Sequence, residues 1–351
     1  MSKKLEINDL ETLIKSPSPS GYEEDAIDVF NSIMPSSNRH YHDKIGNSAF
    51  FYGQGPTTIL LSAHIDEVQA RVTYIADNGI LSIISTGGIC KKSLLASQVQ
   101  IIADNGALVN GIVEKTPIHC EDKDERDEIG DIDTFKVNIG YESKEDVESL
   151  GIHVGSIVIY KRHFNPNFGP NQICACGLDD KIGVFICKEI AKNITKVKGW
   201  HNKYTVIVLA AVQEETGLRG ATVATRALKP NISIDFDVTF ACDNGGGVKK
   251  EKYGEIKLGK GGVIEYGPDK SERLNKILVQ TAKDNNIPFQ YGVSRAGGTN
   301  TDVIQLFSDD CETTLVSIPN RNMHTPIEVV DKRDVEGIIE LVTKAIVERK
   351  L

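Results

Sequence analysis

Apolar and polar positions repeat along the chain with two different periods, and these periods divide the sequence into three stretches. Near the start, residues 5–16 and 22–34 carry apolar side chains at the spacing of amphipathic helices. The segment S-P-S-P-S-G separates them and predicts a break between two helices. Residues 57–63 then form a short apolar run, which is typical of a strand buried in a parallel sheet.

The middle stretch, from Arg71 to about His163, shows the two-residue alternation of half-buried strands. The triplet D-N-G occurs at 77–79 and again at 104–106, and it is a strong signal for a hairpin turn. Within this stretch, residues 119–133 are highly charged and predict a surface loop. We therefore expect a small antiparallel β domain.

After Gly177, predicted helices and strands alternate. The helices are expected over residues 180–193, 217–228, 271–285 and 332–349, and the strands over 204–212, 233–240 and 314–318. Such alternation predicts a mainly parallel sheet with helices on both faces. The fold class expected is thus α/β, a mainly parallel mixed sheet flanked by helices. It is built from residues 1–69 and 164–351, and the β domain of residues 70–163 is inserted between them.

Length and charge exclude several classes of protein. A chain of 351 residues is long enough for two domains, and its net charge of −9 argues against a nucleic-acid-binding surface. The longest apolar run, near 206–212, is far shorter than the roughly 20 residues of a membrane span. We also see no signal peptide at the start. The seven cysteines include no C-x-x-C pair, which predicts free thiols in a reducing cytoplasm.

Acidic and imidazole side chains lie at the ends of five predicted strands, the four above and a further strand in the 170s. They are His64 and Asp66, Asp179 and Asp180, Glu214 and Glu215, Asp235 and Asp237, and His324. The carboxyl ends of parallel strands meet at one edge of a sheet, where sites form. Taken singly, each pattern has a structural explanation, such as a helix N-cap for the D-D pair. Five strand ends together favour a shared cation.

Carboxylates and imidazoles are ligands for Zn²⁺ or a similar divalent ion. Two ions about 3.5–4 Å apart need a bridging carboxylate, which offsets their mutual repulsion. A further carboxylate beside the attacking water would then act as a general base.

The sequence resembles the glutamyl aminopeptidase and tetrahedral aminopeptidase family, metallopeptidase family 42, over nearly its whole length. The resemblance rests on A-H-I-D-E-V (63–68), D-N-G-I-L (77–81), G-I-V-E-K-T-P-I-H (111–119), S-K-E-D-V-E-S-L-G-I-H-V-G (143–155), G-L-D-D-K-I-G (177–183), Q-E-E-T-G-L-R-G-A (213–221), D-V-T (237–239), G-G-T (297–299) and H-T-P-I-E-V-V-D (324–331).

This resemblance implies a role for each site residue. His64 and Asp237 would bind one metal ion, Glu215 and His324 would bind the other, and Asp179 would bridge them. The peptide bond after Asp179 would be cis. Glu214 would be the general base that takes a proton from the attacking water and leaves a metal-bridging hydroxide. Asp66 would orient the ring of His64 from behind, whereas Asp235 would be structural.

The resemblance also implies an architecture and a substrate class. The inserted domain would be a PDZ-like small β-barrel used for dimerisation, and dimers would assemble further, favouring a dodecamer. The substrates would be short peptides with a free N-terminus. Two divalent ions per subunit are expected, Zn²⁺ first, with Co²⁺ and Mn²⁺ as alternatives.

Two other functions stay open. Paired carboxylates also serve glycoside hydrolases, and some relatives carry endoglucanase annotations, but this leaves His64 and His324 without a role. A non-catalytic scaffold of the same fold is the other alternative, although a drifting site should lose its ligands first. The chain departs from the family where Asn300 replaces the usual aspartate of G-G-T-D, which bears on substrate preference.

The ligand set predicts that the protein binds up to two divalent ions per chain. A chelator should abolish peptidase activity, and added metal should restore it, because the chemistry depends on the ions. The measurement is turnover of a chromogenic peptide before and after chelation, with metal content determined on the same samples. Full activity in metal-free protein would contradict the prediction.

Overall fold

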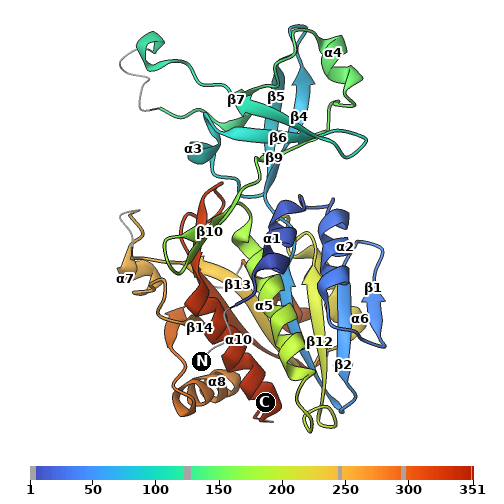
Figure 1. The fold of residues 1–351 in the computed structure, drawn as a ribbon, viewed down its shortest axis with the longest axis vertical. Coiled ribbons are helices and arrows are strands. Elements are labelled where there is room, and N and C mark those ends of the chain that lie inside the picture. Colours follow the sequence, from blue (N-terminus) through green and yellow to red (C-terminus); the bar gives the residue numbers. More distant parts are fainter. Residues whose placement is uncertain (1–4, 122–127, 244–246, 294–297, 349) are drawn as a thin grey trace. The chain divides into compact units, whose positions relative to one another are not determined.

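The computed structural model describes residues 5–121, 128–243, 247–293, 298–348 and 350–351, and the chain divides into two compact units. The larger unit comprises residues 1–67, 164–323 and 327–351, and the smaller one comprises residues 68–163 and 324–326. Figure 1 shows a helix-flanked sheet in the first and a small β structure in the second. The predicted α/β fold class is confirmed.

The large unit is built on an eight-stranded mixed sheet. Its order is β1 (His40–His42), β2 (Ser48–Gly53), β12 (Tyr204–Ala211), β3 (Thr57–His64), β13 (Ile232–Phe240), β16 (Glu312–Asn320), β14 (Gly262–Tyr266) and β15 (Phe289–Val293). The four central strands are β12, β3, β13 and β16, and they run parallel to one another. Their carboxyl ends therefore share one edge of the sheet.

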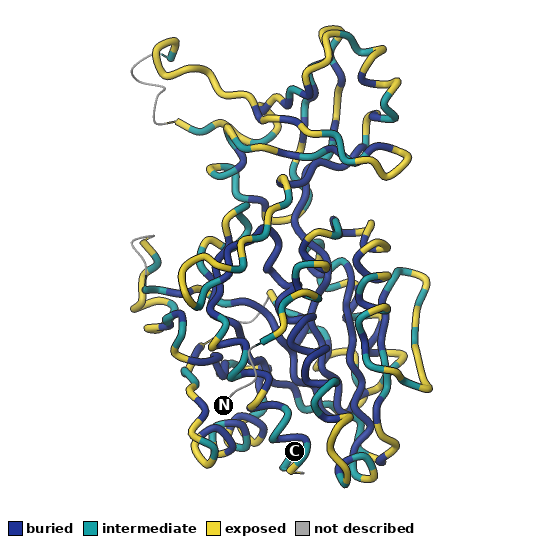
Figure 2. The backbone as a smooth tube through the Cα atoms, viewed as in Figure 1, coloured by how far each residue is buried: buried dark blue, intermediate teal, exposed yellow. Residues whose placement is uncertain are grey.

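Helices cover both faces of this sheet. The larger apolar core joins one face to α1 (Asn8–Lys15), α2 (Glu24–Ile33), α5 (Leu178–Ile194), α8 (Glu272–Asp284) and α10 (Lys332–Val347). A smaller core joins the other face to α6 (Arg219–Leu228) and α9 (Asn300–Phe307). Because β12 lies between two cores, all of its residues are buried, as the dark central strands of Figure 2 show.

Shorter elements complete the large unit. The strands β10 (Phe164–Phe168), β11 (Gln172–Ala175) and β17 (Glu328–Asp331) form a separate antiparallel sheet, and α7 (Lys250–Tyr253) is a single turn. None of the helices in the described ranges combines the length and apolar composition needed to cross a membrane.

The small unit is a closed barrel of antiparallel strands. Around the barrel they are β4 (Gln69–Ile75), β5 (Leu81–Thr86), β8 (Lys136–Asn138), β7 (Leu108–Val113), β6 (Gln98–Ile102) and β9 (Ile157–Tyr160). The helices α3 (Lys91–Leu94) and α4 (Lys144–Ser149) and the 3₁₀ turns η1 (Ile118–Cys120) and η2 (Ile132–Thr134) lie between strands.

Both D-N-G triplets form the predicted hairpin turns of this barrel. Gly79 turns β4 into β5 with φ of 79°, and Gly106 turns β6 into β7 with φ of 80°, values that favour glycine. In the charged stretch 119–133, most described residues are exposed, as predicted for a surface loop, and residues 122–127 lie outside the described part.

Asp334 ties α10 to the segment that precedes β14. Its two carboxylate oxygens accept hydrogen bonds from the backbone N–H groups of Gly259 (2.7 Å) and Gly261 (2.6 Å). The side chain is fully buried, and burial raises the pKa of Asp334 from 3.8 to about 6.

This raised pKa predicts how the stability of the protein depends on pH. Between about pH 4 and 6 the folded chain retains a proton on Asp334 that the unfolded chain has released. The resulting stabilisation is complete below pH 4 and is lost as the pH rises through 6. Asp334→Asn should therefore lower the free energy of unfolding by about 1 kcal/mol more at pH 5 than at pH 7.5. Urea unfolding at both pH values measures this, and an equal loss at both would contradict it.

Candidate metal centre

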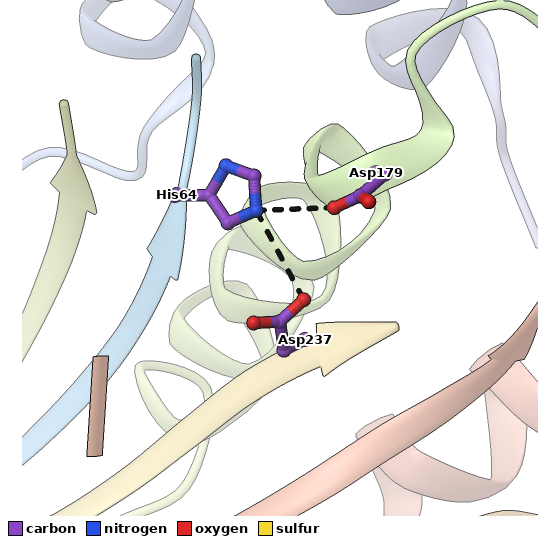
Figure 3. Close-up of side chains that lie close together, drawn as sticks. All are labelled: His64, Asp179 and Asp237. Atoms are coloured by element: carbon purple, nitrogen blue, oxygen red, sulfur yellow. Dashed lines mark hydrogen bonds and ion pairs between the residues drawn. The ribbon is translucent and has the colours of Figure 1, made fainter. Parts of the chain in front are cut away.

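Two neighbouring strands and one helix bring His64, Asp179 and Asp237 together at the carboxyl edge of the large sheet (Figure 3). On β3 and β13, Ser62 pairs with Asp235. The residues two positions further along, His64 and Asp237, therefore lie side by side on the same face. Asp179 is the second residue of α5 and completes the group.

The three side chains are buried and close enough to share one ion. Nε2 of His64 lies 3.1 Å from Oδ1 of Asp179 and 3.9 Å from Oδ1 of Asp237. Burial alone would lower the pKa of His64, but the carboxylates of Glu214, Asp179 and Asp66 outweigh it and raise that pKa well above its usual range. The group as it stands therefore attracts positive charge.

Burial also raises the pKa of Asp237 far above its usual range. The charges of Asp179 and Glu214 add to this effect, whereas His64 opposes it. The aspartate shares its site with other carboxylates and has no permanent cation among the site residues. A bound divalent ion would relieve this repulsion.

Glu214 and Glu215 follow β12, the strand on the other side of β3. Ala211 pairs with His64, so the two glutamates extend past the end of β3. An oxygen of Glu214 lies 3.9 Å from Nε2 of His64, and the pKa of Glu214 is raised to about 8, chiefly by burial. Glu215 and Asp179 offer carboxylate oxygens within 4.8 Å of each other.

Asp66 contacts both His64 and the backbone of the two glutamates. Its oxygens Oδ1 and Oδ2 accept from the N–H groups of Glu214 (2.9 Å) and Glu215 (3.2 Å), and Oδ2 also accepts from the hydroxyl of Ser20 (2.6 Å). Nδ1 of His64 lies 3.1 Å from the main-chain oxygen of Asp66 and 3.5 Å from Oδ1. Asp66 therefore links the loop after β3 to the loop after β12.

The peptide bond between Asp179 and Asp180 is cis, as the family resemblance implies. The backbone N–H of Asp179 donates to Oε2 of Glu328 at 3.0 Å, and Glu328 is buried on β17. Sequence reasoning did not assign Glu328 a role, although it lies in the H-T-P-I-E segment that follows His324. Asp180, the third residue of α5, accepts from the N–H of Gly183 (3.1 Å).

His324 lies in the short segment between β16 and β17 that groups with the small unit. Its Nδ1 is 2.9 Å from the carbonyl oxygen of Gly88. Since a carbonyl only accepts, Nδ1 donates in this hydrogen bond, which would leave Nε2 of the neutral ring to bind a metal ion. Its role beside Asp179 and Glu215 stays a prediction.

Gly297 of the G-G-T motif lies outside the described residues, whereas Asn300 is buried at the start of α9.

The donor atoms of His64, Asp179 and Asp237 fit a divalent transition metal. Ligands about 2.1 Å from a tetrahedral Zn²⁺ lie roughly 3.4 Å from each other. The two separations from Nε2 of His64, 3.1 and 3.9 Å, bracket this value. One imidazole nitrogen with two carboxylate oxygens suits Zn²⁺, Co²⁺ or Mn²⁺ better than Ca²⁺ or Mg²⁺.

Comparison with known protein families gives a match over most of the chain. Residues 47–341 match the family model described as M42 glutamyl aminopeptidase. The chain belongs to this family. Members of the M42 family are aminopeptidases, hydrolases that act on peptide bonds with divalent metal ions, so the family assignment and the site geometry agree.

Relatives of the M42 family resemble the chain along its whole length. The lysyl aminopeptidase of Pyrococcus furiosus is 33% identical over 97% of this chain and 96% of its own. The TET aminopeptidase of a marine sediment thaumarchaeote superposes with a TM-score of 0.90 at 28% identity, covering 97% of this chain and 95% of its own. The TET1 peptidase of Pyrococcus horikoshii has a TM-score of 0.84 at 28% identity and covers 97% and 99% of the two chains.

The arrangement predicts that two aspartates on one strand differ in their effect on metal binding. Asp237→Asn should weaken binding of Zn²⁺ at least tenfold, because a charged oxygen donor beside His64 is lost. Asp235→Asn is the matched control. Asp235 is also buried on β13, but its carboxylate accepts from Ser62 and it does not belong to the donor group. Calorimetric titration of both metal-free variants measures this, and equal weakening in the two would contradict the assignment.

Proposed function

We propose that the protein is a dinuclear metal-dependent aminopeptidase that removes N-terminal residues from short peptides. The observation that carries the proposal is the convergence of His64, Asp179 and Asp237 at one buried point, with Glu214 beside them. Family membership supports the reaction class, and the geometry supports the roles of the individual residues.

The ligand assignment follows the family resemblance and, for the first ion, the group formed by His64, Asp179 and Asp237. His64 and Asp237 would hold one ion, Glu215 and His324 the other, and Asp179 would bridge them. When bound, the ions polarise the scissile carbonyl and lower the pKa of the attacking water. Of the proposed ligands, His64, Asp179 and Asp237 are buried, whereas Glu215 and His324 are partly exposed.

Glu214 is proposed as the general base. Its side chain is nine-tenths buried and lies close to His64. Its backbone N–H donates a hydrogen bond to the carboxylate of Asp66. Its side chain can take a proton from the attacking water and return it to the leaving amine. In the metal-free chain burial raises the pKa of Glu214 to about 8, and bound divalent ions would lower it again and favour the ionised base.

The preferred N-terminal residue is the next question. The family model carries the name glutamyl aminopeptidase, whereas the Pyrococcus furiosus relative is a lysyl aminopeptidase. A panel of chromogenic aminoacyl substrates, run separately with Zn²⁺, Co²⁺ and Mn²⁺, tests class, metal and preference together. Cleavage of none of these substrates with any metal would overturn the proposed function.

A glycoside hydrolase would need only paired carboxylates, so the buried imidazole of His64 weighs against that alternative.

We also propose that the chain assembles into a large particle, with a dodecamer favoured over a dimer. The TET1 peptidase of Pyrococcus horikoshii can assemble into a tetrahedron or a large octahedral shell, and the fold of this chain is closely similar. Light scattering coupled to size exclusion at micromolar concentration should give a mass several times the 38.4 kDa of one chain. A monomer alone would contradict the proposal.

The adjacent glutamates should respond differently to the same substitution. Glu214→Gln keeps the shape of the side chain but cannot accept the water proton, so turnover should fall roughly 10²–10⁴-fold. Its metal content should stay near wild type, because no proposed ligand is removed.

Glu215→Gln is the companion variant, and it should chiefly weaken metal binding. Its activity should recover in part at high metal concentration. The measurements are metal stoichiometry and turnover on each purified variant. Near-normal turnover in Glu214→Gln, or failure chiefly through loss of metal, would show that base and ligand are assigned wrongly.

A further inference from the structure

Four consecutive backbone N–H groups at the end of β12 each donate to a side chain from the first 66 residues of the chain. Val212 donates to Oδ1 of Asn47 (3.1 Å), Gln213 to Oε1 of Glu23 (3.1 Å), Glu214 to Oδ1 of Asp66 (2.9 Å) and Glu215 to Oδ2 of Asp66 (3.2 Å). The loop that carries both glutamates is therefore held by side chains rather than by another strand.

Gln213 is the strained member of this series. Its φ is +55°, in the left-handed region that residues other than glycine rarely adopt. This conformation turns the chain sharply between the end of β12 and Glu214. A non-glycine residue keeps such a conformation only where surrounding contacts fix it.

Glu23 supplies the contact on Gln213. It precedes α2, where its main-chain oxygen accepts from Ile27, but its side chain does not cap that helix. The carboxylate turns instead toward the site loop, where the single oxygen Oε1 accepts from both Gly21 (2.6 Å) and Gln213. Glu23 is only 4% exposed, and it is not one of the proposed metal ligands.

We propose that Glu23 is a positioning residue for Glu214: by holding the N–H of Gln213, it fixes the left-handed turn that aims the general base. This inference rests on the proposed role of Glu214. Asp66 fixes the next N–H, so the direction of the Glu214 side chain is set by two carboxylates on successive peptide groups. Small misplacements of a catalytic group change rates by large factors, about 10²-fold for 1 Å.

The burial of Glu23 is consistent with this role. The pKa of its carboxyl is raised to about 7, chiefly by burial; the charge of Asp66 contributes to the rise, whereas the hydrogen bonds from Gly21 and Gln213 oppose it. Burying a carboxylate is unfavourable unless hydrogen bonds within the protein replace those that it made to water.

The test compares Glu23→Ala, Glu23→Gln and the control Asp334→Ala in the metal-loaded, full-length protein. Glu23→Ala should lower kcat at least tenfold, with KM and metal content near wild type. Glu23→Gln should recover most of that loss, because one amide oxygen can accept from both N–H groups as Oε1 does. If Glu23→Ala does not fold, Glu23→Asp replaces it, since the shorter side chain withdraws the acceptor from Gln213.

Asp334→Ala removes an equally buried carboxylate that also holds two backbone N–H groups, those of Gly259 and Gly261. It should lower the melting temperature but leave kcat per metal-loaded chain unchanged, which separates positioning from general loss of stability. Wild-type kcat in Glu23→Ala, or in Glu23→Asp, would overturn the inference. The inference would also be overturned if Glu23→Gln had a kcat no higher than that of Glu23→Ala.

Glu214→Gln, measured alongside, keeps the two hypotheses apart. If Glu214→Gln retains its turnover, the proposed function fails, whatever the Glu23 variants show. If Glu214→Gln is inactive while Glu23→Ala is normal, only the positioning role fails.

Discussion

Repulsion between buried carboxylates at one edge of the large sheet is the constraint on which the site depends. Asp66, Asp179, Asp180, Glu214 and Asp237 are all at least nine-tenths buried, and His64 is the imidazole placed among them. The pKa values of Asp237 and Glu214 are raised chiefly by burial and further by the neighbouring carboxylates, so negative charge is unfavourable at this site. Bound divalent cations would neutralise these carboxylates, which would then serve as metal ligands. The proposed hydrolytic function depends on that metal binding.

The fold keeps these charges together by two means. The parallel strands β12, β3 and β13 are buried between two apolar cores, so their carboxyl ends are fixed relative to one another. Side chains from the first 66 residues then hold the loop that leaves β12. Asp66 is central because it joins the loop after β3 to the loop after β12.

Much of this could be predicted from sequence, because the strongest signals are local. The apolar runs ending at His64 and near Glu214 predicted parallel strands, and parallel strands place their ends at one edge. The predicted helices over 180–193 and 271–285 appear as α5 and α8. The two D-N-G hairpins also appear where expected.

The remainder depends on contacts between distant parts of the chain. The strand β15 has mostly exposed and half-buried residues, so it lacks a clear apolar pattern, and α9, which follows the G-G-T motif, was not among the predicted helices. Glu23 and Glu328 act through hydrogen bonds to residues 190 and 149 positions away, which no local pattern reveals. The S-P-S-P-S-G segment predicted the break between α1 and α2, but not the hydrogen bond from Ser20 to Asp66.

The central claim is that the ends of neighbouring strands form one metal site. Anomalous diffraction from crystals grown with Zn²⁺ tests this most directly, because it locates the ion without reference to activity. The account predicts a strong peak within bonding distance of Nε2 of His64 and of carboxylate oxygens of Asp179 and Asp237. A second peak should lie beside Glu215. Zinc bound only elsewhere on the chain, with nothing between His64 and Asp237, would contradict the account.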